Sequence, residues 1–403
     1  MDDQAPRRTR RRFLVAGAAV LSGCGGDVVG RPRDASESTT EPIGTDVPSF
    51  QYDDRNTGQT DAGPESEPRR RLRAEIDGAY RAPPAIADGV AYFGGIGGVL
   101  RAVATDTGDV LWSASPDGGG EFEGTRRTPT VADGVVYYTT EVGTVVARTT
   151  DGTRLWTVEA DGPADPGEAS ARRVYGSDPV VGDGRVFVNA GDGVYALDAR
   201  TGAVRWKIPV VTVSPGTPAL ADGAVYFTRP DGYVVAAETA SGEPLWSSRQ
   251  PGVYPGAPAV EGETVYIPAE GGPSVVALDT EDGGERWTFD AGAELAAPVA
   301  VAGGTVYASA GGTLYALDAA DGTERWSRDL GEGVRSVGPP TVADGTVYLA
   351  ARVREQLGSR LLAVDADGGE RWSVGIDVAP DAGPVVADGR VLLVEDFTFA
   401  VYG

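Results

Sequence analysis

The stretch YALDARTGAVRW at residues 195–206 decides the fold, because versions of it recur along the chain. It runs from an apolar segment through a Thr-Gly turn to a tryptophan. The chain has 403 residues and seven tryptophans, and successive tryptophans are 44, 50, 40, 41, 39 and 46 residues apart. They are Trp112, Trp156, Trp206, Trp246, Trp287, Trp326 and Trp372. Self-similarity at this period indicates a repeat protein.

A proline opens an apolar run in every repeat, 27 to 32 residues before the tryptophan where there is one. PALADGAVYF at Pro218 and PTVADGTVYL at Pro340 are examples. β-branched and aromatic residues flank Asp-Gly in these runs, which is typical of a tight β-hairpin. Further turns lead to a third strand and to a fourth that carries the tryptophan. Four strands in about 40 residues predict a β-propeller blade.

The two ends of the repeat region determine the number of blades. Eight prolines open repeats, but the last repeat stops at AVYG, before its fourth strand. Leu72 precedes Pro84 by 12 residues, the same distance as from Trp206 to Pro218. We therefore predict an all-β, eight-bladed β-propeller of four-stranded antiparallel blades, closed by an N-terminal strand around Leu72. The alternative is seven blades and a separate hairpin.

The spacing Ala-x-Asp-x-x-Thr-Gly-x-x-x-Trp resembles the tryptophan-docking motif of propellers of the pyrroloquinoline quinone (PQQ) dehydrogenase type. It is complete in Ala196, Asp198, Thr201, Gly202 and Trp206. Other repeats depart from it, with Ala104 or Glu238 in the aspartate position. The resemblance covers about residues 69–403. It implies that the tryptophans, with Leu72 in the eighth position, lie flat between neighbouring blades as packing residues.

The N-terminus resembles an export signal. TRRRFL at residues 9–14 matches the twin-arginine pattern, with Arg10 and Arg11 as the pair. The apolar run that follows is too short to span a bilayer. LSGC then resembles a lipobox, in which Cys24, the only cysteine, becomes the lipid-carrying N-terminus. We expect a signal peptide at residues 1–23 and a protein anchored by lipid at the extracellular face of the cell membrane.

Residues 24–68 are rich in Gly, Pro, Ser, Thr, Asp and Glu and have no apolar periodicity. This composition predicts a flexible acidic tether that leads to a propeller domain at residues 69–403. Within the tether, QYDDRNTGQT at residues 51–60 has an alternative interpretation, as an ordered lead-in that packs on the domain.

The charge of the chain excludes some partners. Its formal net charge is −24, and arginine supplies all but one of its 35 basic side chains. Such a chain has no basic surface for nucleic acid or anionic lipid, so only the lipid anchor would contact the membrane. An acidic, arginine-rich surface is typical of halophilic archaeal proteins. The alternative is an acidic extracellular protein from a GC-rich genome.

The chain has no histidine, and its only cysteine lies in the signal region. We therefore assign no catalytic and no metal-binding residue. The resemblance implies PQQ and calcium for the catalytic members, but their adjacent-cysteine disulfide is missing here and their Glu-Asn-Asp calcium set has only a weak candidate in Asn189. We expect a monomeric, non-catalytic binding or scaffold protein without a cofactor, similar to the lipid-anchored propeller of the bacterial outer-membrane assembly machine. The alternative is a PQQ- and calcium-dependent dehydrogenase.

Insertions indicate where a partner would bind. The loops after Trp112 and Trp156 take 17 and 23 residues to reach the next proline, and the turn at residues 351–360 is also extended. Long loops on a rigid scaffold often bind partners. The predicted binding face consists of Glu121, Phe122, Arg126, Arg127, Arg172, Arg173, Tyr175, Arg352 and Arg354. Its arginines suit a protein or an anionic ligand at the cell surface. The alternative is that they are only solvated surface charges.

Overall fold

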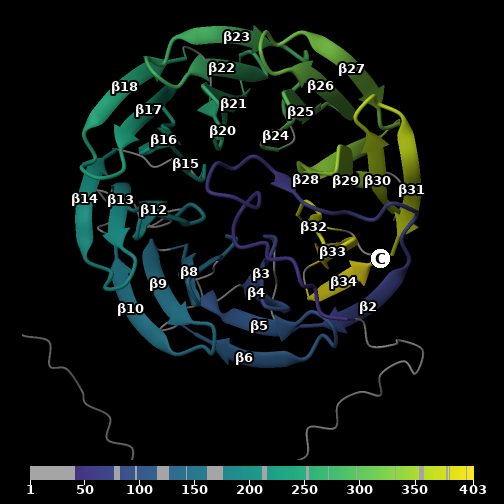
Figure 1. The fold of residues 1–403 in the computed structure, drawn as a ribbon, viewed down its shortest axis with the longest axis horizontal. Coiled ribbons are helices and arrows are strands. Elements are labelled where there is room, and N and C mark those ends of the chain that lie inside the picture. Colours follow the sequence, from purple (N-terminus) through teal and green to yellow (C-terminus); the bar gives the residue numbers. More distant parts are fainter. Residues whose placement is uncertain are drawn as a thin grey trace, which may run out of the picture. The chain divides into compact units, whose positions relative to one another are not determined.

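The computed structural model describes residues 41–76, 82–95, 98–115, 127–141, 143–160, 176–210, 216–250, 254–270, 272–295, 297–331, 333–353, 358–377, 380, 382–395 and 397–403. Contacts divide the chain into Met1–Glu37 and Ser38–Gly403, and every described residue belongs to the second unit. This unit is a ring of eight sheets (Figure 1), which confirms the predicted eight-bladed propeller. No helix in the described part is long and apolar enough to cross a membrane.

Each blade is an antiparallel sheet whose first strand lies nearest the axis and whose last strand lies on the rim (Figure 1). Blades 1 and 2 consist of β3 (Ala85–Ala87), β4 (Val90–Gly94), β5 (Leu100–Ala104), β6 (Val110–Ala114), β7 (Thr130–Ala132), β8 (Val135–Thr139), β9 (Thr144–Thr149) and β10 (Arg154–Glu159). Blades 3 and 4 consist of β11 (Val180–Gly182), β12 (Arg185–Ala190), β13 (Gly193–Asp198), β14 (Val204–Pro209), β15 (Ala219–Ala221), β16 (Ala224–Thr228), β17 (Tyr233–Glu238) and β18 (Pro244–Arg249).

The second half of the ring repeats this order. Blades 5 and 6 consist of β20 (Ala259–Glu261), β21 (Thr264–Glu270), β22 (Val275–Asp279), β23 (Glu285–Phe289), β24 (Ala300–Ala302), β25 (Thr305–Ala310), β26 (Thr313–Asp318) and β27 (Glu324–Asp329). Blades 7 and 8 consist of β28 (Val334–Ala343), β29 (Thr346–Val353), β30 (Ser359–Asp365), β31 (Glu370–Ile376), β32 (Val385–Ala387), β33 (Arg390–Glu395), β34 (Thr398–Tyr402) and β2 (Arg70–Glu75). Two short strands add to blades 7 and 5, namely β1 (Gln59–Thr60) and β19 (Tyr254–Pro255).

The predicted Asp-Gly hairpins join the first two strands of a blade. At Asp222-Gly223 both residues have positive φ, 49° and 80°, as a type I′ turn requires. Asp tolerates this conformation better than most side chains, and Gly adopts it freely. We call the end of the ring that carries these turns the turn face. The opposite end, where each rim strand leads to the next blade, is the loop face.

Tryptophans join neighbouring blades. Trp206 Nε1 of blade 3 donates to the Thr239 carbonyl of blade 4 at 2.9 Å. The indole covers Gly242, where a Cβ would lie 2.8 Å from the ring and φ is 75°, so glycine fits best there. The same indole-to-carbonyl bond is made by Trp112, Trp156, Trp246, Trp287 and Trp326. The tryptophans thus lie between blades, where the sequence motif placed them.

The ring closes through its N-terminal strand, as predicted. β2 pairs antiparallel with β34, and Leu72 lies opposite Val401. A bulge precedes Leu72, and the tryptophan strands have a bulge in the same place, for example before Trp206 opposite Ala196. Leu72 is 6% exposed and belongs to a cluster that joins blades 8 and 1. The core consists of eight such clusters of buried residues between neighbouring blades.

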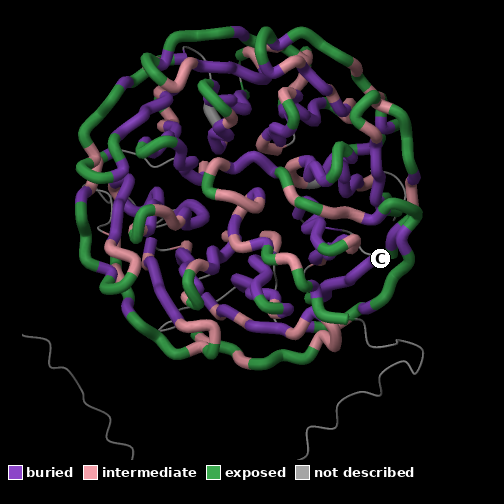
Figure 2. The backbone as a smooth tube through the Cα atoms, in the orientation of Figure 1, coloured by how far each residue is buried: buried purple, intermediate pink, exposed green. Residues whose placement is uncertain are grey.

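The predicted tether at residues 24–68 is wrong from residue 41 onward, because this part packs on the ring. Ile43, Val47 and Asn56 are almost completely buried, and β1 pairs in parallel with β28 of blade 7. The segment runs across the middle of the ring (Figure 1 and Figure 2). The alternative of an ordered lead-in therefore holds for residues 51–60. The export residues Arg10 and Arg11 and the lipid attachment residue Cys24 lie outside the described residues.

Candidate functional site

The axis of the ring is occupied by residues 47–58, which we call the axial segment. The first strand of each blade has one unpaired edge that faces the axis, and buried N–H groups there need acceptors. Among the described residues, the first-strand residue two positions before the hairpin turn donates to the axial segment in seven of the eight blades. These donors are Ile86, Val131, Leu220, Val260, Val301, Val342 and Val386, at 2.6–2.9 Å.

Three side chains of the axial segment make hydrogen bonds to the surrounding blades. Asn56 is fully buried, and its Nδ2 donates to the carbonyls of Thr217, Pro218 and Pro258 in blades 4 and 5, at 2.9–3.3 Å. Gln51 Nε2 donates to the Val299 carbonyl of blade 6 at 2.8 Å. Tyr52 Oη accepts from the Val386 N–H of blade 8 at 2.7 Å. Burial raises the pKa of Tyr52 to about 12, so its phenol stays neutral at neutral pH.

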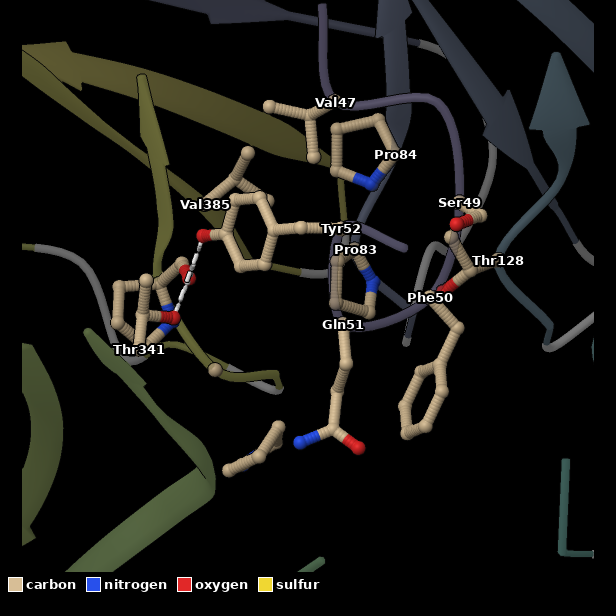
Figure 3. Close-up of a pocket in the computed structure, with 13 residues that line it drawn as sticks. Val47, Ser49, Phe50, Gln51, Tyr52, Pro83, Pro84, Thr128, Thr341 and Val385 are labelled. Atoms are coloured by element: carbon tan, nitrogen blue, oxygen red, sulfur yellow. Dashed lines mark hydrogen bonds between the residues drawn. The ribbon is translucent and has the colours of Figure 1, made fainter. Parts of the chain in front are cut away.

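A small pocket remains at the mouth of the axis on the loop face (Figure 3). Its volume is about 30 Å³, enough for about two water molecules. Its walls are the axial segment and the residues that open the first strands of four blades. The lining residues are Val47, Ser49, Phe50, Gln51, Tyr52, Pro83, Pro84, Thr128, Pro339, Thr341, Gly383, Pro384 and Val385. Tyr52 is the only titratable residue among them.

A buried carboxylate joins the blades beside this mouth. Asp178 of blade 3 accepts from the Thr128 N–H of blade 2 at 2.7 Å and from Thr217 Oγ1 of blade 4 at 2.5 Å. Burial raises the pKa of Asp178, although Arg127 and both hydrogen bonds favour the ionised form. Asp178 therefore connects three blades at the points where the two long loops and the next loop return to the ring.

The raised pKa of Asp178 predicts a pH-dependent cost to stability. The folded protein binds the Asp178 proton more tightly than the unfolded chain does. The bound proton therefore stabilises the fold at low pH, and this contribution is lost as the pH rises through the pKa of Asp178 in the folded protein. Asp178→Asn should therefore gain stability relative to the wild type as the pH rises from 4 towards 8, as measured by urea unfolding. Asp133→Asn on the turn face is the control. A stability difference between the wild type and Asp178→Asn that does not change with pH would contradict the expectation.

Most of the predicted binding face cannot be placed. Glu121, Phe122, Arg126, Arg172, Arg173, Tyr175 and Arg354 lie outside the described residues. Arg127 is half-buried beside Asp178 and next to Thr128 of the mouth. Arg352 lies on β29 of blade 7, in register with Arg335 on β28. Arg127 and Arg352, the two described arginines of the predicted binding face, are thus three blades apart around the ring, and both lie on the loop face.

Sequence reasoning assigned no role to Gln51, Tyr52 and Asn56. The signal that could have found them was the lead-in interpretation of residues 51–60. Gln51, Tyr52 and Asn56 all have positive φ, and Asn is one of the few residues that tolerates it well. Asn189, the weak calcium candidate, is buried and donates to the Gly216 carbonyl at 2.7 Å.

The described residues do not fit a quinone and its calcium ion on the axis. Pockets for small-molecule ligands usually have about 300–1,000 Å³, at least about ten times the volume of the mouth. Among the described residues there is no group of three or more Asp, Glu, His or Cys side chains that could hold a metal ion. The place that an axial ligand needs is taken by Gln51, Tyr52 and Asn56.

Comparison with known proteins finds similar sequences in assembly factors and in enzymes. The chain is 33% identical over 181 residues to the serine/threonine-protein kinase AfsK of Streptomyces griseus, an alignment that covers 40% of this chain and 20% of the kinase. The chain spans 12–40% of the length of the curated relatives it matches.

Two solved structures show the fold alone, because their sequence identity is low. BamB from Moraxella catarrhalis is 17% identical, with a TM-score of 0.62 over 84% of this chain and 98% of that one. Quinohemoprotein alcohol dehydrogenase from Comamonas testosteroni is 15% identical, with a TM-score of 0.67 over 91% and 81%. The family model described as outer membrane protein assembly factor BamB matches residues 54–181, 167–273 and 271–396, and because these take in most of the chain, the protein belongs to this family of PQQ-like repeat propellers.

Proposed function

We propose that this protein is a non-catalytic binding scaffold at the cell surface, exported by its twin-arginine signal and anchored through a lipid on Cys24. The family supports a binding role, because its model is described as an assembly factor. The partner would be a protein that docks on the loop face, with the arginines of the long loops contacting its carboxylates.

The observation that carries the proposal is the chemistry of the mouth. Acid–base catalysis needs a titratable group within hydrogen-bond reach of the substrate. The described lining has no Asp, Glu, Lys, Arg, His or Cys, and Tyr52, with its pKa of about 12, is engaged with the backbone of blade 8. Four prolines make the walls rigid and offer no N–H donor. The mouth therefore suits a protein contact surface better than an active site.

The path of the chain also supports an orientation. Residues 41–44 lie between the turns of blades 1 and 8 on the turn face, where Arg390 donates to the Glu41 carbonyl and the Gly44 N–H donates to Asp388. Residue 41, the first described residue, therefore lies at the turn face. We place the partner on the loop face, at the opposite end of the ring.

A PQQ- and calcium-dependent dehydrogenase is the second candidate, because the motif around Trp206 resembles that of the PQQ dehydrogenases, although the described axis does not fit the quinone and its calcium ion. An optical titration of the purified protein with PQQ and calcium separates the two candidates, because only a dehydrogenase would develop a bound-quinone spectrum.

Shortening the loops after Trp112 and Trp156 to 12 residues each, the length found after Trp206, should abolish capture of the partner. The reason is that these loops would supply most of the contact surface while the blades beneath them stay intact. The measurement is crosslinking to cell-surface proteins, with the crosslinked partner identified by mass spectrometry and the fold checked by circular dichroism.

The matched control changes the opposite face. Asp133→Asn combined with Asp183→Asn removes two charges from the turn face at positions where Asn tolerates the positive φ. This variant should capture the same partner as the wild type. Equal capture by the wild type and by the folded short-loop variant would show that the loop face is not the site.

A further inference from the structure

The hydrogen bonds on the axis form a regular crown. In seven of the eight blades, within the described residues, the first-strand residue two positions before the hairpin turn directs its N–H towards the axis, so equivalent donors surround the axis. Backbone carbonyls of the axial segment accept from six of these blades. The acceptors are Val47, Pro48, Asp54, Arg55, Thr57 and Gly58. A crown of donors that face inward selects for a ligand with many carbonyl acceptors spaced along a chain.

The axial segment matches the crown at three further points through side chains. The amides of Gln51 and Asn56 donate to carbonyls at the open ends of the first strands, and the Tyr52 hydroxyl accepts from the Val386 N–H of blade 8. Asn56 contacts blades 4 and 5, and Tyr52 contacts blades 7 and 8. The segment thus supplies both donors and acceptors, as a bound peptide does when it adds to an exposed strand edge.

Blade 3 is the exception within the described residues, and its neighbours are joined in another way. The axial segment passes this blade at Asp54, whose carboxylate would lie 3.9 Å from a Cβ on Gly182. Blades 2, 3 and 4 are instead connected by Asp178. The interruption falls between Pro48 and Asp54, where the chain makes a tight turn through Gln51 and Tyr52 with φ of 48° and 75°.

We propose that the axis of this ring is a polypeptide-binding site, and that residues 47–58 are its bound ligand in the place that a small-molecule cofactor would need. The ligand class is a peptide segment with a turn at Gln51–Tyr52 and an asparagine at the position of Asn56. The axial site is tested on residues 47–58 and the scaffold function on the long loops of the loop face, so either proposal can fail without the other.

The full chain allows a direct test, because Glu65, Ser66 and Glu67 are exposed between the axial segment and β2. A specific protease site inserted after Glu65 would separate the two without removing either. After cleavage, the fragment that ends at Glu65 should stay bound to the folded ring in gel filtration and native mass spectrometry. A fluorescent synthetic peptide of residues 41–65 should then exchange into the cleaved protein and not into the uncut insertion variant.

Peptide variants test the recognition itself. The peptide with Asn56→Ala should compete at least about tenfold more weakly, because it loses the buried amide whose two hydrogens are shared among the carbonyls of Thr217, Pro218 and Pro258. The peptide with Gln59→Ala is the matched control, because that residue is exposed, and it should compete like the parent. Release of the fragment from a folded ring, unfolding of the ring on cleavage, or equal exchange of a scrambled peptide would each overturn the proposal.

Discussion

Replacement of the closing strand, residues 70–75, by Gly-Ser-Gly-Ser-Gly-Ser should lower the free energy of unfolding by at least about 5 kcal/mol. Leu72 would leave a buried position, which costs about 2–5 kcal/mol by itself, and the paired strand would lose its β-formers. The edge of β34 would also be exposed. The replacement keeps the chain length, so the axial segment is not pulled from its place. Thermal and urea unfolding at constant salt measure the effect.

The same replacement at residues 28–33 is the control, because these residues precede the described part of the ring. It should leave the unfolding transition unchanged. Residues 41–60 are no neutral control, because many of them are buried on the ring. Equal unfolding transitions for the two replacements would contradict closure by β2.

Trp206→Ala should lower the free energy of unfolding by about 3–5 kcal/mol. The substitution removes an indole that is 9% exposed, packs 5.8 Å from Phe187 and donates to the Thr239 carbonyl of the next blade. It also uncovers Gly242, where the indole of Trp206 leaves no room for a Cβ. Trp206→Phe should recover part of the loss, because an aromatic ring still covers the glycine while the hydrogen bond is gone.

Trp326→Ala is the internal comparison for this prediction. Trp326 is more exposed than Trp206 and makes the equivalent bond, to the Ala366 carbonyl. Its removal should therefore cost measurably less in the same urea titration. A cost for Trp206→Ala below that for Trp326→Ala would show that burial between blades does not determine what the tryptophans contribute.

The mouth and the axis could be predicted only in part. The extended loops after Trp112 and Trp156 indicated the loop face, and Thr128, which ends the first of them, does line the mouth. The residues that fill the axis were assigned to a tether or, for residues 51–60, to a lead-in. Asp178 was not singled out, because one aspartate before a proline looks like any other in a chain with 59 acidic residues.

The sequence by itself determined the ring. The spacing of the tryptophans, the prolines and the Asp-Gly turns repeats because every blade must place the same side chains against its neighbour, and a regular requirement leaves a regular pattern. Leu72 could be placed opposite the last blade for the same reason, since its distance to Pro84 equals that from Trp206 to Pro218.

Only the tertiary structure decided what lies on the axis. Residues 47–58 are held mainly by backbone carbonyls, which every residue type has, so their binding leaves no apolar periodicity in the sequence. These carbonyls find their donors only when the ring brings blades that are far apart in the chain around one axis, so that their unpaired N–H groups point to it. A local pattern cannot carry that information, because the partner of each carbonyl is created by closure of the ring.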